Sequence, residues 1–256
     1  MKNKKSNFSE WYIEALTGAD LFDYTKVSGC IVFKPASFAI WEKIVAEVDK
    51  RLKAVGVKNG YFPFLIPKRF LMKEKDHFEG FAPEVAWVTK TGETELDEPL
   101  ALRPTSEALM YDSFAKWIRS HRDLPLRFNQ WCNVIRWEFK HATPFLRTRE
   151  FLWNEGHTVF ATQKQALAEE KQIMDIYKEV TEDYLALPGI MGRKTDKEKF
   201  AGAVFSVTIE HIMPDGKAIQ GPPFHHDGQN FSKMFKISFL DEKDKNQYVW
   251  QNTFAI

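Results

Sequence analysis

The sequence has only two cysteines in 256 residues, Cys30 and Cys132. Neither belongs to a Cys-x-x-Cys pair, so no cysteine-based metal cluster or disulfide framework is visible, and a reducing compartment is expected. Apolar runs long enough to span a bilayer are missing, and the amino-terminal residues lack the apolar core of a signal peptide. We therefore expect a soluble, cytoplasmic protein without a membrane partner and without a protein-bound metal.

A strong net charge is missing as well, because 36 lysines and arginines are balanced by 35 aspartates and glutamates. The formal charge of +1 gives no global signature of a nucleic-acid binder, although local basic patches could still serve that purpose. Repeats and low-complexity segments do not stand out. Hydrophobic residues make up 44% of the chain, with 22 phenylalanines and 8 tryptophans, so a sizeable core in one large or two small domains is possible.

Periodicity predicts helices next to an antiparallel sheet, which is an α+β fold. The helices are expected at residues 7–16, 35–56, 105–121 and 163–187. The strands are expected at residues 61–67, on both sides of a glycine turn within 84–104, and at 133–139, 151–157, 204–210, 217–220 and 236–239. Pro63 interrupts the first strand, and proline belongs at a sheet edge. This edge is either a dimer contact or an ordinary end of the sheet.

The stretch NVIRWEFKHATPFLRTREFLWNEGH, residues 133–157, combines apolar, aromatic and charged residues. Alternation in its two ends predicts a pair of antiparallel strands joined by a long loop. One face of this hairpin collects Arg136, Glu138, Phe151, Trp153, Glu155 and His157. A solvated face with cross-strand ion pairs is one interpretation. Large aromatic groups beside charges suit a pocket better.

These motifs resemble a known family. Arg136-x-Glu138, followed by a loop and Arg147-x-x-x-Phe151-x-x-x-Glu155, resembles motif 2 of the class II aminoacyl-tRNA synthetases. GVKNGYFPFLIP resembles their motif 1, and RPTSE (103–107) resembles the amino-acid-recognising Thr-x-Glu loop. With FNQWCNVIRWEFKH, GRKTDKEKFAG and GQNFSKMF, the resemblance narrows to the prolyl-tRNA synthetases. Only 69 positions run from Gly156 to Phe224, which leaves no room for the bacterial editing insertion and indicates the archaeal and eukaryotic-cytosolic type.

The resemblance implies a class II catalytic fold over residues 1–256, with ATP, Mg²⁺, L-proline and the acceptor end of tRNA(Pro) as ligands, and a homodimer formed through the Pro63 region. It places Arg136 between the proline carboxylate and the α-phosphate, where a guanidinium fork suits two anions. Arg147 is expected on the outer phosphates, Phe151 on the adenine, and Glu138 as acceptor for the adenine amino group. Gln220 is expected to hold the nucleotide. The alternative for Arg136 is a structural ion pair with Glu138.

Proline binding requires an acceptor for a secondary ammonium and an apolar slot for the ring. By resemblance, Thr105 and Glu107 supply the oxygens, and Trp153 offers a ring face. Four further side chains are expected to complete the wall, namely Glu155, His157, Phe200 and His225. The alternative for His157 is a hydrogen-bonded core histidine without a ligand.

The sequence departs from the family pattern twice. Within QGPPFHHDGQNF (220–231), Pro222, Pro223 and Phe224 replace small residues, and Asp227 replaces an apolar one. We expect this change to reshape the proline pocket, since prolines fix φ and remove N–H donors. The chain also ends before a segment resembling motif 3, so the catalytic fold is expected to be incomplete at the carboxyl end. Alternatives are therefore a non-catalytic synthetase-derived binding module, or a threonyl-type enzyme, whose zinc site finds no match in the two cysteines.

Overall fold

The computed structural model describes residues 3–77, 84–138 and 141–256, with no side-chain description for 73–77. The chain begins with α1 (Phe8–Gly18), the hairpin β1 (Phe22–Tyr24) and β2 (Ile31–Phe33), and the long α2 (Pro35–Ala54). Pro35 occupies the first turn of α2, where the missing N–H of proline costs no helical hydrogen bond. β3 (Lys58–Asn59), β4 (Leu65–Pro67) and α3 (Lys68–His77) follow, with β5 (Trp87–Thr91) and β6 (Thr94–Leu102) after them.

The second part of the chain builds most of the central sheet. It contains α4 (Glu107–Trp117), the 3₁₀ turn η1 (His121–Asp123), β7 (Leu126–Ile135) and β8 (Glu150–Phe160). α5 (Gln163–Lys178) continues into the π-helical η2 (Glu179–Tyr184), and β9 (Ile190–Arg193), β10 (Phe205–Ile212) and β11 (Ala218–Gly228) follow. The chain closes with α6 (Asn230–Phe235), β12 (Ser238–Leu240), β13 (Asn246–Tyr248) and β14 (Trp250–Ala255).

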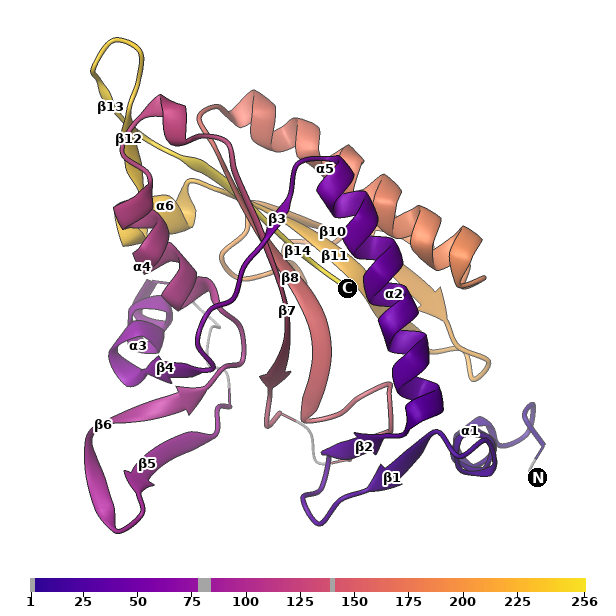
Figure 1. Ribbon diagram of the computed structural model, residues 1–256. Coiled ribbons are helices and arrows are strands. Elements are labelled where there is room, and N and C mark those ends of the chain that lie inside the picture. Colours follow the sequence, from indigo (N-terminus) through magenta and orange to yellow (C-terminus); the bar gives the residue numbers. More distant parts are fainter. Residues whose placement is uncertain (1–2, 78–83, 139–140) are drawn as a thin grey trace.

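Seven strands form the central sheet in the order β3-β7-β8-β14-β11-β10-β9. Every neighbouring pair is antiparallel except β3 and β7. Helices α2 and α5 cover one face, while α4 and α6 cover part of the other (Figure 1). The predicted α+β class and antiparallel sheet with flanking helices are confirmed.

Alternation along the strands sends their side chains to two different layers. The layer under α2 and α5 includes Val48, Tyr177, Phe224 and Phe254, all at most 1% exposed. The layer under α4 and α6 is built around the fully buried Tyr111, with Phe114 and Phe231 against its ring. Burying aromatic side chains of this size supplies much of the driving force for folding.

Several predicted boundaries are wrong. The predicted strand 133–139 already ends at Ile135, although it begins earlier, at Leu126; residues 139 and 140 lie outside the described part. Of the predicted strand 61–67, only Leu65–Pro67 is extended and paired. The predicted helix 105–121 runs only from Glu107 to Trp117. β11 is far longer than the predicted strand 217–220, because it continues through both prolines.

The path of β11 explains how the sheet accommodates Pro222 and Pro223. On one side, pairing with β14 extends only from Gly228 to Phe224, so the prolines lie beyond that ladder. On the other side, the register with β10 shifts between Thr208 and Glu210, next to the partner of Pro223. Prolines are tolerated at irregular or edge positions, where their missing N–H removes no ladder bond.

Candidate active site

A cavity of about 370 Å³ opens on the sheet face opposite α2 and α5. Ten of the twelve residues expected at a ligand site line it: Thr105, Glu107, Arg136, Glu138, Trp153, Glu155, His157, Phe200, Gln220 and His225. Phe151 lies just behind this lining, with its ring 5.7 Å from that of Trp153. Arg147 is exposed on the segment between β7 and β8 and lies outside the lining. The expected residues therefore converge on one cavity, apart from these two.

The β7–β8 hairpin positions one wall of the cavity. Its register pairs Val134 with Phe151 and Cys132 with Trp153, as the predicted antiparallel hairpin requires. Because side chains alternate along β8, Trp153, Glu155 and His157 all face the cavity. The pocket interpretation of this face is confirmed, since all three are buried or half-buried.

Arg136 follows directly after the end of β7, and its backbone N–H still donates to the Arg149 carbonyl at 2.8 Å. Its Nε donates to the Pro104 carbonyl at 3.0 Å, and its guanidinium lies 5.1 Å from the Trp153 ring centre. Within the described residues no carboxylate forms an ion pair with Arg136, so the alternative of a structural pair with Glu138 is not what the structure contains. The guanidinium edge not held by Pro104 is available to a ligand anion.

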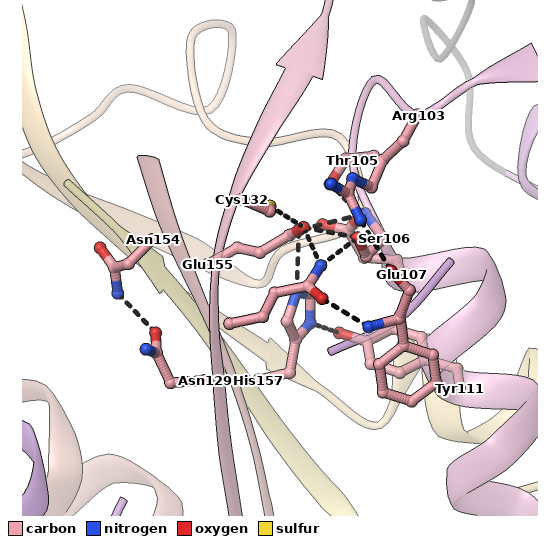
Figure 2. Close-up of polar contacts among 12 residues, drawn as sticks. Arg103, Thr105, Ser106, Glu107, Tyr111, Asn129, Cys132, Asn154, Glu155 and His157 are labelled. Atoms are coloured by element: carbon pink, nitrogen blue, oxygen red, sulfur yellow. Dashed lines mark hydrogen bonds and ion pairs between the residues drawn. The ribbon is translucent and has the colours of Figure 1, made fainter. Parts of the chain in front are cut away.

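Glu155 is the centre of a buried hydrogen-bond network (Figure 2). It is 2% exposed and accepts from Ser106 Oγ at 2.5 Å, Ser106 N at 3.1 Å and Gln130 Nε2 at 2.6 Å. Burial alone raises the pKa of this carboxyl, but hydrogen bonds and the charge of His157, together with the Ser106 and Gln130 donors, outweigh burial and lower it. Glu155 therefore remains an anion that fixes its neighbours, with its oxygens already occupied by protein donors.

This network explains the start of α4. Ser106 occupies the N-cap position but makes no side-chain capping bond, and its hydroxyl donates to Glu155. Gln130 Nε2 also donates to Ser106 Oγ at 2.6 Å, while Gln130 Oε1 accepts from Phe62 N at 2.9 Å. As a result, the loop before α4 is tied to the central sheet rather than capped locally.

Thr105 and Glu107 lie on either side of Ser106, and both line the cavity. The Thr105 hydroxyl donates to the Glu107 carboxylate, which is 7% exposed. The fully buried Arg103 anchors the residues before α4. Its Nη1 donates to the Phe62 carbonyl at 2.9 Å, and its Nη2 donates to the Asn133 carbonyl at 2.9 Å. Glu107 is thus a nearly buried carboxylate in the first turn of α4, and it lines the cavity.

His157 has features of both alternatives, a residue of the pocket wall and a hydrogen-bonded core histidine. Its Nδ1 lies 3.2 Å from the Tyr111 hydroxyl and its Nε2 lies 3.3 Å from Glu155 Oε2. It is 1% exposed, as a core histidine would be, and it also forms part of the cavity wall.

The opposite wall comes from the segment after β9 and from β11. Phe200 and His225 stand there with ring centres 5.0 Å apart. At the outer rim, Lys194 donates to the Gln220 side-chain oxygen, and Glu138 is exposed. The cavity therefore has a buried acidic end at Glu107 and a cationic side formed by Arg136 and Lys194.

Only one member of the unusual Pro-Pro-Phe run reaches this cavity. Pro223 is part of its lining, whereas Phe224 packs on the other face of the sheet against its cross-strand partner Phe254. Phe224 is 0% exposed within the hydrophobic layer under α5. The expectation that all three residues reshape the pocket is wrong for Phe224, since strand alternation turns its ring away.

Sequence reasoning missed several residues of the site. Lys194 lies within the GRKTDKEKFAG run, but its position depends on the path of the segment after β9, which periodicity does not reveal. Gln130 stands directly opposite Glu155, yet the predicted strand began only at Asn133. A longer strand prediction would have paired the two. Thr253 lines the cavity from β14, where it lies opposite both His157 and His225.

Two further observations concern ions and membranes. Among the described residues, no cluster of three or more histidine, cysteine, aspartate or glutamate side chains has the geometry of a metal site. Within the same ranges, every helix is too short or too polar to cross a bilayer.

Residues 87–256 match the model of the tRNA synthetase class II core domain (G, H, P, S and T), and the chain belongs to this family. Within the class it is similar to the prolyl-tRNA synthetases and corresponds to their catalytic domain. A crystal structure of prolyl-tRNA synthetase from Cryptosporidium parvum, complexed with halofuginone and AMPPNP, superposes with a TM-score of 0.96 at 48% identity. It is matched over 100% of this chain and 53% of its own length.

Curated relatives agree with this assignment. The cytoplasmic proline–tRNA ligase of Arabidopsis thaliana is 51% identical over 98% of this chain. The bifunctional glutamate/proline–tRNA ligase of Mus musculus is 53% identical over 99% of it. The chain spans 48% of the length of the first protein and 17% of the second. The predicted resemblance to the eukaryotic and archaeal type is confirmed.

Proposed function

We propose that this chain forms the site that activates L-proline for protein synthesis. In the first step a proline carboxylate oxygen attacks the α-phosphorus of ATP, the bond to the β-phosphate breaks, and pyrophosphate leaves. In the second step the terminal ribose hydroxyl of tRNA(Pro) attacks the prolyl carbonyl, and AMP leaves. The observation that carries the proposal is one cavity that holds a buried carboxylate at Glu107 and the Arg136 guanidinium, which has no carboxylate partner among the described residues.

The acidic end of the cavity suits the secondary ammonium of proline. Glu107 is nearly buried, and a buried carboxylate is stabilised by an opposite charge. We assign the ammonium to Glu107 and Thr105, and the ring to the slot between Trp153 and the Phe200–His225 wall. The Trp153 face adds attraction for the charge next to the ring.

The cationic side of the cavity suits the reacting anions. A carboxylate and a phosphate repel each other, so the site must supply positive charge and alignment more than a base. Arg136 can donate to both anions at once, because its Nε is fixed on Pro104 and its other N–H groups face the cavity. Lys194 adds a second cation on the same side. Bound Mg²⁺ would neutralise phosphate charge with few protein ligands.

The nucleotide is assigned to the rim. Glu138 and Gln220 line it, and we place the adenine amino group on Glu138 and the phosphates toward Gln220. Phe151, with its ring 5.6 Å from the Arg136 guanidinium, supplies the stacking surface, and Arg147 reaches the outer phosphates from its exposed segment. The AMPPNP in the Cryptosporidium parvum complex supports an ATP site in this fold.

The wider context of the enzyme is also a proposal. The tRNA(Pro) acceptor end would approach the cavity mouth, and the protein would act in the cytoplasm, as the Arabidopsis relative is named. A homodimer would use the exposed segment around Pro63, where Tyr61 is 67% and Leu65 is 41% exposed. Exposed apolar groups gathered on one edge are typical of an interface. Sedimentation velocity at increasing protein concentration tests this assembly.

The central test is ATP–pyrophosphate exchange that depends on L-proline, combined with calorimetric binding of L-proline and AMPPNP. We expect exchange in the native chain and a loss of about 100- to 1,000-fold in Arg136→Lys, which keeps the charge but loses the fork. Arg122→Lys, an exposed arginine outside the cavity lining, is the matched control and should retain full exchange.

A second candidate function is a binding module without turnover. Pro223 in the cavity wall favours it, because proline there removes an N–H donor that a nucleotide could use. Proline binding without exchange would select this candidate. Failure to bind either ligand would overturn both.

A further inference from the structure

Ser206 and His225 form a cross-strand pair between β10 and β11. Ser206 is fully buried, and its Oγ lies 2.6 Å from His225 Nδ1. His225 is half-buried and lines the cavity, whereas Ser206 lies behind it. The serine therefore reaches a ligand only through the histidine.

The hydrogen bonds of Ser206 determine where its proton lies. The backbone N–H of Phe200 donates to Ser206 Oγ at 3.1 Å, so the hydroxyl oxygen already accepts one bond. Among the described residues, His225 Nδ1 is the remaining partner of this hydroxyl, and a buried O–H is costly without an acceptor. The Ser206 hydroxyl thus donates to Nδ1. A neutral imidazole in this arrangement carries its own proton on Nε2.

The surroundings keep His225 neutral. Burial lowers its pKa to about 3, and the positive charges of Lys194 and Arg136 act in the same direction. Nε2 has no hydrogen-bond partner among the described residues, and it belongs to a ring in the cavity wall. An N–H donor is therefore presented in the same cavity as the guanidinium of Arg136.

We propose that Ser206 is a positioning residue that fixes His225 as an Nε2–H donor toward an anionic oxygen of the bound ligand. The same hydroxyl holds the backbone of Phe200, so one buried side chain orients both residues of this wall. The oxygen belongs either to the amino-acid carboxylate or to a nucleotide phosphate. This inference rests on the proposed function for the identity of the ligand, but not for the tautomer.

The tautomer is measured directly by long-range ¹H–¹⁵N correlation spectra of histidine-labelled protein, with His225→Gln to assign the signal. We expect unprotonated Nδ1 and protonated Nε2 in the native chain. Ser206→Thr keeps the hydroxyl and should keep this pattern, whereas Ser206→Ala should give a mixture of tautomers. A protonated Nδ1 in the native chain, or a pattern unchanged in Ser206→Ala, would overturn the inference.

Ligand titrations then test the donor role of His225 separately from the proposed function. L-proline or AMPPNP, added separately, should shift the His225 Nε2 signal for the ligand whose oxygen accepts the bond. Ser206→Ala should weaken binding of that ligand by about five- to tenfold, with Ser206→Thr close to native. Binding without any change at Nε2 refutes the donor role and leaves the proposed function intact. Absence of binding by both ligands refutes the proposed function, whatever the tautomer.

Discussion

Asp227 should make the protein lose stability as pH rises, in contrast to a carboxylate that is paired in the fold and has a lowered pKa. The residue lies at a register shift of β11, between His226 and Gly228, and is 0% exposed. Neither of its side-chain oxygens has a hydrogen-bond partner among the described residues. Burial raises its pKa well above the ordinary value, and the negative charge of Glu107 adds to the effect. Thr253 acts in the opposite direction, although its hydroxyl lacks a partner of hydrogen-bond geometry as well.

The direction of this pH dependence follows from the number of protons bound in the folded and unfolded states. Between the ordinary pKa of an aspartate, about 3.9, and the raised pKa of Asp227, the folded state holds one proton more than the unfolded state. The free energy of unfolding therefore falls by about 1.4 kcal/mol for each unit of pH in this window. Even when protonated, an unsatisfied buried carboxyl costs about 1–3 kcal/mol. Both contributions disappear when an apolar side chain replaces it.

The experiment compares urea unfolding of the native chain, Asp227→Asn and Asp227→Leu at pH 5, 6 and 7. We expect the advantage of both variants over the native chain to grow with pH, by up to about 1.4 kcal/mol per pH unit while the pH lies below the raised pKa of Asp227, with an additional constant gain for leucine. Asp241→Asn is a matched control, because backbone N–H groups of Lys245 and Lys243 lower the pKa of Asp241, so its difference from the native chain should not change with pH between 5 and 7. Parallel pH curves for the native chain and Asp227→Asn would refute this reasoning.

Two further predictions concern the strand that carries the cavity wall. Gly156→Ala should destabilise the fold by about 1–3 kcal/mol in urea unfolding, because the added methyl group would overlap the Phe254 ring opposite it. A native unfolding midpoint in this variant would contradict the packing described. Glu155→Gln should cost about 3–5 kcal/mol, since an amide nitrogen would face donors on Ser106 and Gln130. The pKa of Glu155 is lowered in the fold, so this loss should shrink as pH falls below about 4; a pH-independent difference would argue against it.

The hairpin shows what periodicity can establish. A repeat of two residues fixes which side chains share a face, and the observed register places Trp153, Glu155 and His157 together as predicted. The same rule fails at the ends of strands. β7 begins seven residues before Asn133, but it buries Asn129 and Gln130, whose polarity hides the strand. β11 is obscured in the same way by its two prolines, because sheet irregularities are not visible in a sequence.

Most residues of the candidate site could be predicted from the sequence, whereas the contacts among their side chains could not. Motif resemblance named ten of the residues that line the cavity, and their roles toward proline and ATP stay predictions. Hydrogen bonds between side chains from different strands could not be predicted from the sequence. Nothing in the sequence indicates that Glu155 is saturated by Ser106 and Gln130, or that Ser206 stands behind His225. Such pairs arise from strand register, which joins residues far apart in the chain.

The alternation of β8 and β11 has a consequence for protein engineering. Odd-numbered positions such as 153, 157, 223 and 225 face the cavity, while even-numbered neighbours such as Asn154 and Phe224 are buried on the opposite side. A mutant library restricted to positions 153, 223 and 225 would vary the shape of the pocket while leaving the packing under α5 untouched. Glu155 and His157 face the same cavity but also hold the buried network at α4, so they should stay constant in such a library.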